Sequence, residues 1–284
     1  MKLKIAIQKS GRLYEDSVQL LQECGIGLSN GFNQLRAEAA NFPLEALFLR
    51  DDDIPQYVAD GVADIGIAGE NVVLEKDRQV GITERLGFAR CRLSIAVPRN
   101  ADRGDIASLQ GKKIATSYPR LLRRYLDAQC ITAEIHEISG SVEIAPGIGL
   151  ADAICDLVSS GSTLFLNGLR ETEVVLRSEA VLISSHALPP AKAKLLEQLL
   201  FRINAVRAAR RYKYILLNAP NEKLEAICGI LPGMKSPTIL PLAQQGWSSL
   251  HSVVQEDEFW NITENLKAQG AQGILVVPIE KMIL

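Results

Sequence analysis

Residues 143–164 read EIAPGIGLADAICDLVSSGSTL, and this stretch decides how the chain is interpreted. The apolar run 153–158 has the composition of a buried strand and carries one acidic residue, Asp156. It opens into residues 159–163, a short loop of small, hydroxyl-bearing residues around Gly161. Loop amides and hydroxyls donate hydrogen bonds to phosphate, and carboxylates accept them from sugar hydroxyls. The order of these residues therefore favours a site for a phosphorylated sugar.

A second carboxylate, Asp152, stands four residues before Asp156. Residues at even spacing on a strand share a face, so we expect both carboxylates to point the same way. They would bind ribose hydroxyls or hold Mg²⁺ together with substrate oxygens, and the alternative is a pair of solvated charges at a sheet edge. No GK[ST] sequence follows, so the loop is not a Walker loop. The candidate phosphate ligands of the loop are Ser159, Ser160, Gly161, Ser162 and Thr163.

Length and composition describe a globular protein with more than one core. The chain has 284 residues, of which 47% are hydrophobic and 23% charged, and its formal net charge is −2. This length predicts two or three domains, and the near-neutral charge predicts no nucleic-acid partner. The five cysteines lack metal-ligand or CxxC spacing, which favours buried thiols in a reducing compartment. The N-terminus reads as a strand rather than a signal peptide, and no apolar run is long enough for a bilayer, so we expect a cytoplasmic protein with no membrane partner.

Alternating strand and helix patterns predict an α/β region over the first three quarters of the chain. Apolar runs at 3–7, 44–49 and 62–69 predict buried strands, and amphipathic patterns predict helices at 13–24 and 191–211. A second strand–loop–helix unit begins at residue 111, after a polar stretch at 100–104 where we expect a crossover. We therefore predict one lobe from residues 1–95 and 180–211, and a second lobe from residues 96–179.

The pattern changes after residue 212. Apolar runs at 214–217, 238–242, 247–254 and 274–278 alternate with helical patterns at 222–230 and 256–268 in the order βαββαβ. This order is typical of the ferredoxin-like split βαβ unit, and roughly 70 residues suffice for a separate domain. We therefore predict a C-terminal domain over residues 212–284.

Charged side chains follow several predicted strands, at the carboxyl ends where α/β proteins bind ligands. Lys9 and Arg12 lie in the first βα loop and are candidates for anion binding, although most Lys and Arg residues are surface charges. Arg50 ends another strand, where it contacts a ligand or pairs with the aspartates at 51–53. A metal cage made by those aspartates is disfavoured, because adjacent residues on an extended chain alternate in direction and a helix N-terminus accommodates them equally well.

Two more residues are candidates for ligand contact. Glu70 follows the glycine-rich end of a buried strand, where a ligand can approach the backbone closely. Tyr118 precedes Pro119, and it either stacks on a base or packs locally. Both therefore enter the list of candidates for a nucleotide site.

Several enzyme classes lack their motifs in this chain. The three histidines have no partner at metal-ligand spacing, and no GxSxG sequence occurs, which disfavours nucleophilic hydrolase chemistry. A dinucleotide oxidoreductase is disfavoured because the glycines at 147 and 149 have no third glycine at GxGxxG spacing. A solute-binding module without catalysis remains the other alternative, and the lack of a signal peptide argues against it.

These motifs resemble the long form of the ATP phosphoribosyltransferase family, the first enzyme of histidine biosynthesis. The family's signature lies in residues 143–164, and the matching residues are Glu143, Gly149, Ala151, Ile154, Asp156, Gly161 and Thr163. Further matching stretches are QKSGRL at 8–13, RDDDIP at 50–55, DIGIAGENV at 64–72 and ATSYP at 115–119. In the tail, LPG at 231–233, PTILPL at 237–242 and VPIEKM at 277–282 resemble the regulatory domain of the long form.

The resemblance implies two α/β lobes like those of type II periplasmic binding proteins, with the active site between them, plus a ferredoxin-like regulatory domain. It implies transfer of a phosphoribosyl group from phosphoribosyl pyrophosphate to N1 of the adenine ring of ATP, with release of pyrophosphate. Mg²⁺ is expected mainly on the substrate phosphates, without assigned protein ligands. Histidine is expected to inhibit through the tail, AMP to compete in the cleft, and homodimers to assemble into hexamers.

The resemblance also assigns roles to the candidate residues. The loop at 160–163 would hold the 5-phosphate, and Asp156 together with Asp152 would hold the ribose hydroxyls. No acid, base or nucleophile is expected, because displacement at the anomeric carbon mainly requires positioning and charge neutralisation. Lys9 and Arg12 would contact the pyrophosphate or the phosphates of ATP. The candidates for the nucleotide side of the ATP site are Arg50, Glu70 and Tyr118. The candidates for the histidine site, at predicted strand ends, are Thr238, Gly270 and Gly273.

Overall fold

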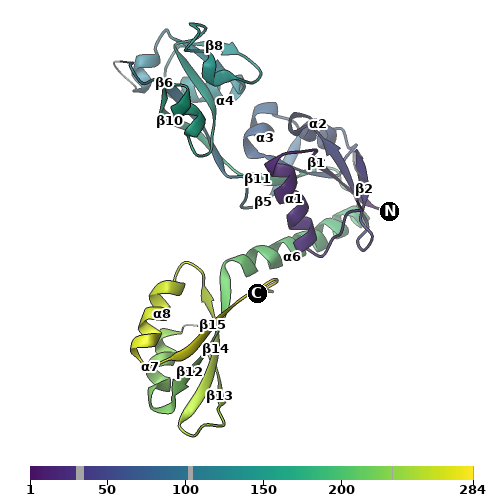
Figure 1. The fold of residues 1–284 in the computed structure, drawn as a ribbon. Coiled ribbons are helices and arrows are strands. Elements are labelled where there is room, and N and C mark those ends of the chain that lie inside the picture. Colours follow the sequence, from purple (N-terminus) through teal and green to yellow (C-terminus); the bar gives the residue numbers. More distant parts are fainter. Residues whose placement is uncertain (30–34, 102–104, 232, 284) are drawn as a thin grey trace. The chain divides into compact units, whose positions relative to one another are not determined.

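The computed structural model describes residues 1–29, 35–101, 105–231 and 233–283, which form two compact units. The first unit comprises Met1–Gln19 and Ile26–Leu195, and the second comprises Leu20–Gly25 and Leu196–Leu284. Most elements can be located by their labels in Figure 1. The crossover expected at residues 100–104 and the LPG match at 231–233 lie partly outside the described residues.

The first sheet has six strands in the order β2-β3-β1-β4-β11-β5. The strands are β1 (Leu3–Gln8), β2 (Arg36–Glu38), β3 (Leu44–Leu49), β4 (Ile65–Gly69), β5 (Val80–Arg85) and β11 (Ala180–Ser185). β1 runs parallel to β3 and β4, so the carboxyl ends of these three strands meet at one edge. The central strands are almost wholly buried, as expected for a parallel sheet covered on both faces. The helices of this part are α1 (Arg12–Glu23), η1 (Asp51–Asp53), α2 (Ile54–Ala59) and α3 (Glu70–Lys76).

The second sheet has five strands in the order β10-β6-β9-β7-β8. The strands are β6 (Cys91–Pro98), β7 (Lys113–Thr116), β8 (Glu134–Glu137), β9 (Ala153–Val158) and β10 (Leu169–Ser178). The helices are η2 (Ile106–Leu109), α4 (Pro119–Ala128), η3 (Val142–Ile144) and α5 (Ser162–Leu166). Alternate residues of β9 enter different cores: Cys155 packs with Leu122 on one face, and Ile154 and Val158 pack with Leu164 on the other. The alternation places Asp156 on the face shared with Ile154 and Val158.

The third sheet lies in the second unit and has the order β13-β14-β12-β15, with every neighbouring pair antiparallel. The strands are β12 (Tyr212–Pro220), β13 (Thr238–Pro241), β14 (Trp247–Gln255) and β15 (Gln272–Pro278). The helices are α6 (Pro190–Arg210), η4 (Asn221–Lys223), α7 (Leu224–Ile230) and α8 (Phe259–Ala268). Ile215, Leu250 and Leu266 are fully buried members of its core. The chain order βαββαβ and this strand order confirm the predicted ferredoxin-like fold.

Three strands are absent from the sequence-based prediction: β2, β5 and β10. β10 reads LRETEVVLRS, and most of its residues are only partly buried. It lies at the edge of its sheet, so its charged side chains remain near solvent and mask the apolar signal of a strand. The lobe boundary predicted between residues 95 and 96 falls inside β6, which belongs wholly to the second sheet. The chain therefore crosses between the two sheets at residues 86–90 and returns at Glu179. The crossover expected at residues 100–104 is wrong, because β6 before this stretch and β7 after it belong to the same sheet.

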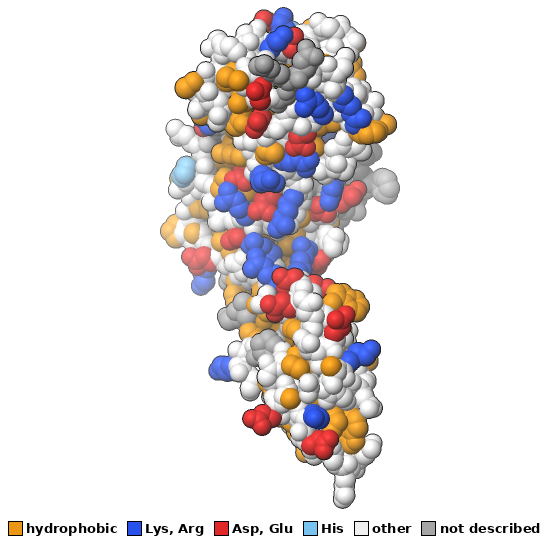
Figure 2. Space-filling model, turned by 90° about the vertical axis from the view of Figure 1, so that its left-hand side faces the viewer, with side chains coloured by type: hydrophobic (Ala, Val, Ile, Leu, Met, Phe, Trp, Pro, Cys, Tyr) orange, Lys and Arg blue, Asp and Glu red, His pale blue; other side chains and the backbone are white. Residues whose placement is uncertain are grey.

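Surface charge is mixed on the face drawn in Figure 2, where Lys and Arg side chains lie among Asp and Glu side chains. Within the described residues, no helix is both long and apolar enough to cross a membrane.

Candidate functional site

The loop after β9 is held in a defined conformation. Gly161 has φ of 81°, in the left-handed region that residues with a Cβ avoid, and α5 begins directly after it. The Ser160 and Ser162 hydroxyl oxygens lie 2.9 Å apart, and the Asn167 Nδ2 donates to the Thr163 carbonyl at 2.9 Å. The loop therefore closes on itself and leaves a concave surface beside the end of β9.

A cavity of about 250 Å³ lies against this loop. Its lining residues include Glu143, Asp156, Ser159, Ser160, Gly161 and Thr163. These residues combine two carboxylates with hydroxyls and backbone amides. Such a set of groups suits a ligand that carries both hydroxyl donors and phosphate acceptors.

Asp156 is the carboxylate that β9 positions at this cavity. Its Oδ1 accepts a hydrogen bond from the Leu157 amide at 2.8 Å. Burial raises the pKa of Asp156, and the nearby negative charge of Glu143 raises it further. Two neighbouring carboxylates in one cavity favour a bound cation or a ligand rich in hydroxyl donors, because either would relieve their repulsion.

The structure does not bring Asp152 to the loop. β9 begins at Ala153, so strand alternation does not extend to residue 152. The Asp152 carboxylate instead accepts from the Lys113 amide at 2.9 Å and lies 3.5 Å from the Lys112 Nζ, in a separate cavity. Four residues of strand span about 13 Å, which is too far for both carboxylates to hold one ribose. The expected pairing of Asp152 with Asp156 is therefore wrong.

Two cationic candidates meet at the edge of the first sheet. Lys9 and Arg50 follow the paired ends of β1 and β3, and the Lys9 amide donates to the Leu49 carbonyl at 2.8 Å. Both residues are exposed, as is Arg12, whose Nε lies 3.9 Å from an Asp16 carboxylate oxygen. The parallel pairing thus places Lys9 and Arg50 side by side at the carboxyl edge of the sheet, a proximity that is not part of the sequence-based prediction.

Tyr118 is joined to the first sheet's helices through a chain of hydrogen bonds. Its hydroxyl accepts from the Asn71 Nδ2 at 3.1 Å. Asn71 is fixed in turn by Ser178, whose Oγ accepts from the Asn71 amide at 3.0 Å and donates to the Asn71 Oδ1 at 2.8 Å. Burial raises the pKa of Tyr118, and the negative charge of Asp156 adds to the increase. The negative charge of Asp156 therefore disfavours ionisation of the Tyr118 hydroxyl. Asn71, which holds Tyr118, lies within the matching stretch at 64–72, but its local pattern does not mark it as a site residue.

Glu70 is buried and forms an ion pair with Arg85 on β5. The pair lines a cavity of about 490 Å³ together with Arg90, Cys91 and Glu179. The Glu70 carboxylate is thus already bound within the protein, and its expected contact with a nucleotide has no geometric support here.

Asp51 is a further carboxylate of note. Its Oδ1 is buried and has no hydrogen-bond partner among the described residues. Burial raises the pKa of Asp51 to about 6, with a smaller contribution from Asp52. In the sequence, Asp51 is signalled by its position after Arg50 at a strand end and by the matching stretch at 50–55. No group of three or more His, Cys, Asp or Glu residues within the described ranges is arranged to hold a metal ion.

The three residues expected to form the histidine site lie at opposite edges of the third sheet. Thr238 begins β13 at one edge, whereas Gly270 and Gly273 flank the start of β15 at the other. Three strand spacings separate these edges by about 14 Å. The three residues therefore do not form one small-molecule site within a single copy of this sheet.

Comparison with known proteins links this chain to a family. A family profile described as ATP phosphoribosyltransferase matches residues 50–205, and another described as the HisG C-terminal domain matches residues 209–281. The ATP phosphoribosyltransferase of Cytophaga hutchinsonii is 59% identical over 281 residues, which cover 99% of this chain and 98% of that protein. That of Bacteroides thetaiotaomicron is 56% identical over 282 residues, which cover 99% and 100% of the two chains.

Solved structures give the same result for the fold. An ATP phosphoribosyl transferase (HisG:HisZ) complex from Thermotoga maritima matches with a TM-score of 0.62 and 28% identity, covering 71% of this chain and 96% of that chain. A histidine kinase sensor domain with similarity to periplasmic binding proteins matches with a TM-score of 0.50 and 11% identity, covering 74% and 91%. The second match concerns the fold alone, and it agrees with the predicted architecture of two periplasmic-binding-protein-like lobes.

Proposed function

This chain belongs to the ATP phosphoribosyltransferase family, glycosyltransferases of histidine biosynthesis, and we propose that it transfers the phosphoribosyl group of phosphoribosyl pyrophosphate to N1 of the adenine ring of ATP. Pyrophosphate is the leaving group. The observation that carries this proposal is the cavity beside β9, where Asp156 and Glu143 face the hydroxyls and amides of the 159–163 loop. A phosphorylated ribose supplies the partners that these groups need.

Asp156 is the residue that the proposal places closest to the chemistry. Its carboxylate accepts hydrogen bonds from the ribose hydroxyls, while the loop donates to the 5-phosphate. Displacement at the anomeric carbon builds positive charge on the ribose ring, and a neighbouring carboxylate stabilises that charge. N1 of adenine attacks with its own lone pair, so no general base is required. Catalysis then depends on orientation and electrostatics.

The cationic side chains Lys9, Arg12 and Arg50 are proposed to neutralise the phosphates of the two substrates. Lys9 and Arg50 lie at the same sheet edge, and all three are exposed and able to reach an anion. Tyr118 is proposed to contact the adenine side, because the Asn71 hydrogen bond fixes its orientation.

Mg²⁺ fits the donors of the cavity, although the protein offers few of them. Asp156 and Glu143 present carboxylate oxygens, which Mg²⁺ prefers, and Mg²⁺ is commonly held by one or two carboxylates plus substrate phosphates. We assign it mainly to the pyrophosphate of the substrate. When bound, it would neutralise charge on the leaving group.

The C-terminal ferredoxin-like domain is proposed to be regulatory. Histidine would bind there and inhibit the enzyme, AMP would compete with ATP, and the protein would act in the cytoplasm as a homodimer or hexamer. Removal of residues 212–284 should abolish inhibition by histidine. A truncated enzyme that remains active and histidine-sensitive would refute the regulatory role of this domain.

The proposed reaction is tested by mixing the full chain with ATP, phosphoribosyl pyrophosphate and Mg²⁺ and measuring pyrophosphate release. We expect release that requires both substrates. Binding of phosphoribosyl pyrophosphate without turnover would instead identify a solute-binding module of the same fold. An absorbance change with NAD and an alcohol would favour an oxidoreductase.

A further inference from the structure

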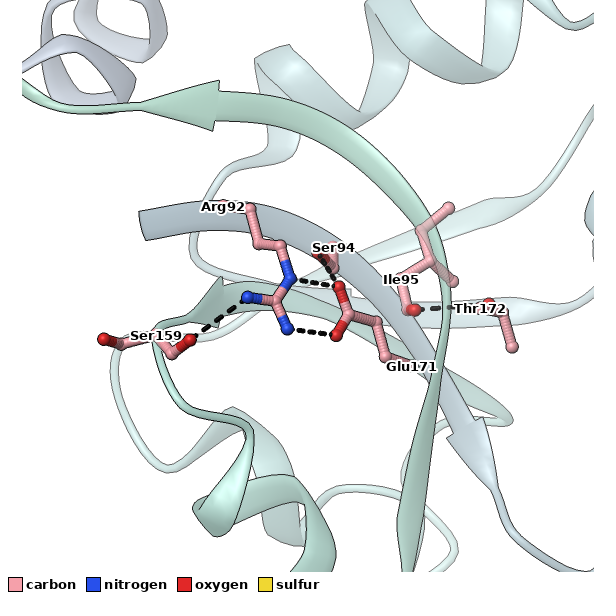
Figure 3. A network of polar contacts seen from close by, with 6 residues as sticks. All are labelled: Arg92, Ser94, Ile95, Ser159, Glu171 and Thr172. Atoms are coloured by element: carbon pink, nitrogen blue, oxygen red, sulfur yellow. Dashed lines mark hydrogen bonds and ion pairs between the residues drawn. The ribbon is translucent and has the colours of Figure 1, made fainter. Parts of the chain in front are cut away.

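A network of charged and polar groups contacts the first residue of the 159–163 loop (Figure 3). Arg92 on β6 donates from Nε and Nη2 to the two carboxylate oxygens of Glu171 on β10, each at 2.5 Å. The Arg92 Nη1 donates to the Ser159 carbonyl at 3.1 Å, and the Ser94 Oγ donates to Glu171 at 2.8 Å. One guanidinium therefore joins two strands to the first residue of the loop.

The contact with the Ser159 carbonyl fixes the direction of the next amide. The peptide bond is planar and trans, so the Ser160 N–H points away from the side on which Arg92 holds the Ser159 oxygen. Rotation of that peptide would turn the Ser160 amide and shift the turn at Gly161. The direction of the loop amides thus depends on a side chain that lies outside the loop.

The same network extends to the neighbourhood of Asp156. Ser94 is paired with Asp156 across β6 and β9, and Arg92 is paired with Val158. Arg92, Ser94 and Asp156 therefore share one face of the sheet. The hydrogen bonds from Arg92 hold the pKa of Glu171 below its ordinary value, so Glu171 remains charged and keeps the guanidinium fork in place.

We propose that Arg92 and Glu171 are positioning residues that set the loop for the 5-phosphate of phosphoribosyl pyrophosphate. The inference rests on the proposed function of the loop. Arg92 acts through the Ser159 carbonyl, and Glu171 acts through Arg92. The alternative is that Arg92 binds the phosphate itself, in which case Glu171 competes with the ligand for the guanidinium.

The two roles predict opposite effects of Glu171→Gln. If Arg92 positions the loop, Glu171→Gln and Arg92→Gln both raise the KM for phosphoribosyl pyrophosphate about tenfold, and the double variant is no worse than either single one. Arg92→Lys keeps the charge but not the fork, so it should fall between Arg92→Gln and the wild type. The KM for ATP should change less than about twofold, because the network does not reach the cationic edge of the first sheet.

The chain offers a matched control in Arg36 and Glu45. Arg36 donates from Nε to Glu45 at 2.7 Å between the neighbouring strands β2 and β3, and a second bond from its Nη2 reaches the same oxygen. This pair joins two strands of the first sheet and contacts no residue of the loop. Arg36→Gln should leave the KM for phosphoribosyl pyrophosphate unchanged. Because Arg36 is more exposed than Arg92, this substitution should lower thermal stability no more than Arg92→Gln does.

The decisive measurement is steady-state kinetics on these full-length variants with Mg²⁺ present, varying each substrate in turn. A KM for phosphoribosyl pyrophosphate unchanged in Arg92→Gln, or lowered in Glu171→Gln, overturns the inference. Failure of the proposed function would give a different set of results. In that case the wild type shows no turnover, or Thr163→Ala in the loop leaves the KM for phosphoribosyl pyrophosphate unchanged.

Discussion

Replacement of Asp156 by Asn should impair turnover without weakening the fold. Asp156 lines the loop cavity, and its hydrogen bond from the Leu157 amide can be kept by the amide oxygen of Asn. The substitution removes the negative charge and one of the two acceptor oxygens. It is therefore a test of the ribose contact with little change of shape.

The size of the effect follows from the hydrogen bonds that would be lost. A hydrogen bond to a charged group contributes about 1.5–3 kcal/mol, and the stabilisation of positive charge on the ribose ring adds to it. A loss of about 3 kcal/mol corresponds to a decrease of about 150-fold in kcat/KM for phosphoribosyl pyrophosphate. The same substitution should not lower the stability of the fold. Burial raises the pKa of Asp156, so the folded state disfavours its charged form, and Asn removes that penalty.

The assay compares kcat/KM with the midpoint of urea unfolding for the same preparation. Asp152→Asn is the matched control, since it makes the same chemical change at the opposite end of β9, where the carboxylate faces Lys112 and Lys113. We expect Asp152→Asn to change kcat/KM less than about threefold. Wild-type rates for Asp156→Asn would refute the ribose role. Equal losses of activity in both variants would refute the placement of the site at the loop.

Two predictions concern stability. The pKa of Asp51 is raised from 3.8 to about 6 by burial, so the unfolded chain loses this proton first and stability falls as the pH rises between these values. Asp51→Asn removes this dependence on pH. The free energy of unfolding of the variant minus that of the wild type should therefore increase by about 2–3 kcal/mol from pH 4 to pH 7. A difference that stays constant over this range would contradict the burial argument. The Glu75 carboxylate accepts from the Arg120 and Leu121 amides at the start of α4, each at 2.9 Å. Glu75→Ala should therefore lower the free energy of unfolding in urea by about 1–2 kcal/mol. Glu134, which forms an exposed ion pair, is the control, and an equal decrease for Glu134→Ala would argue against this capping role.

The parts of the fold that sequence predicts well are those with strong local patterns. The apolar run of β9, the loop that follows it and the βαββαβ order of the tail each carry their signal within a few neighbouring residues. The sequence also places Lys9 and Arg50 each after a strand, but their proximity depends on the parallel pairing of β1 with β3.

The features that sequence misses depend on boundaries and long-range pairing. Alternation predicts only a shared face for Asp152 and Asp156, whereas four residues of strand separate them by about 13 Å and Asp152 contacts Lys112 and Lys113. Thr238 and Gly270 fall on opposite edges of a sheet whose strand order local patterns do not determine. The partner of Arg92 is 79 residues away on β10, a strand whose charged residues hide it. Such contacts become visible only when the register of three strands is known.

A structure of the full chain with phosphoribosyl pyrophosphate and Mg²⁺ bound tests the central claim most directly. The account predicts the 5-phosphate within hydrogen-bond distance of the amides and hydroxyls at residues 160–163, with the ribose hydroxyls on the Asp156 carboxylate. Density for the triphosphate of ATP in this loop, or a ribose bound away from Asp156, would contradict it.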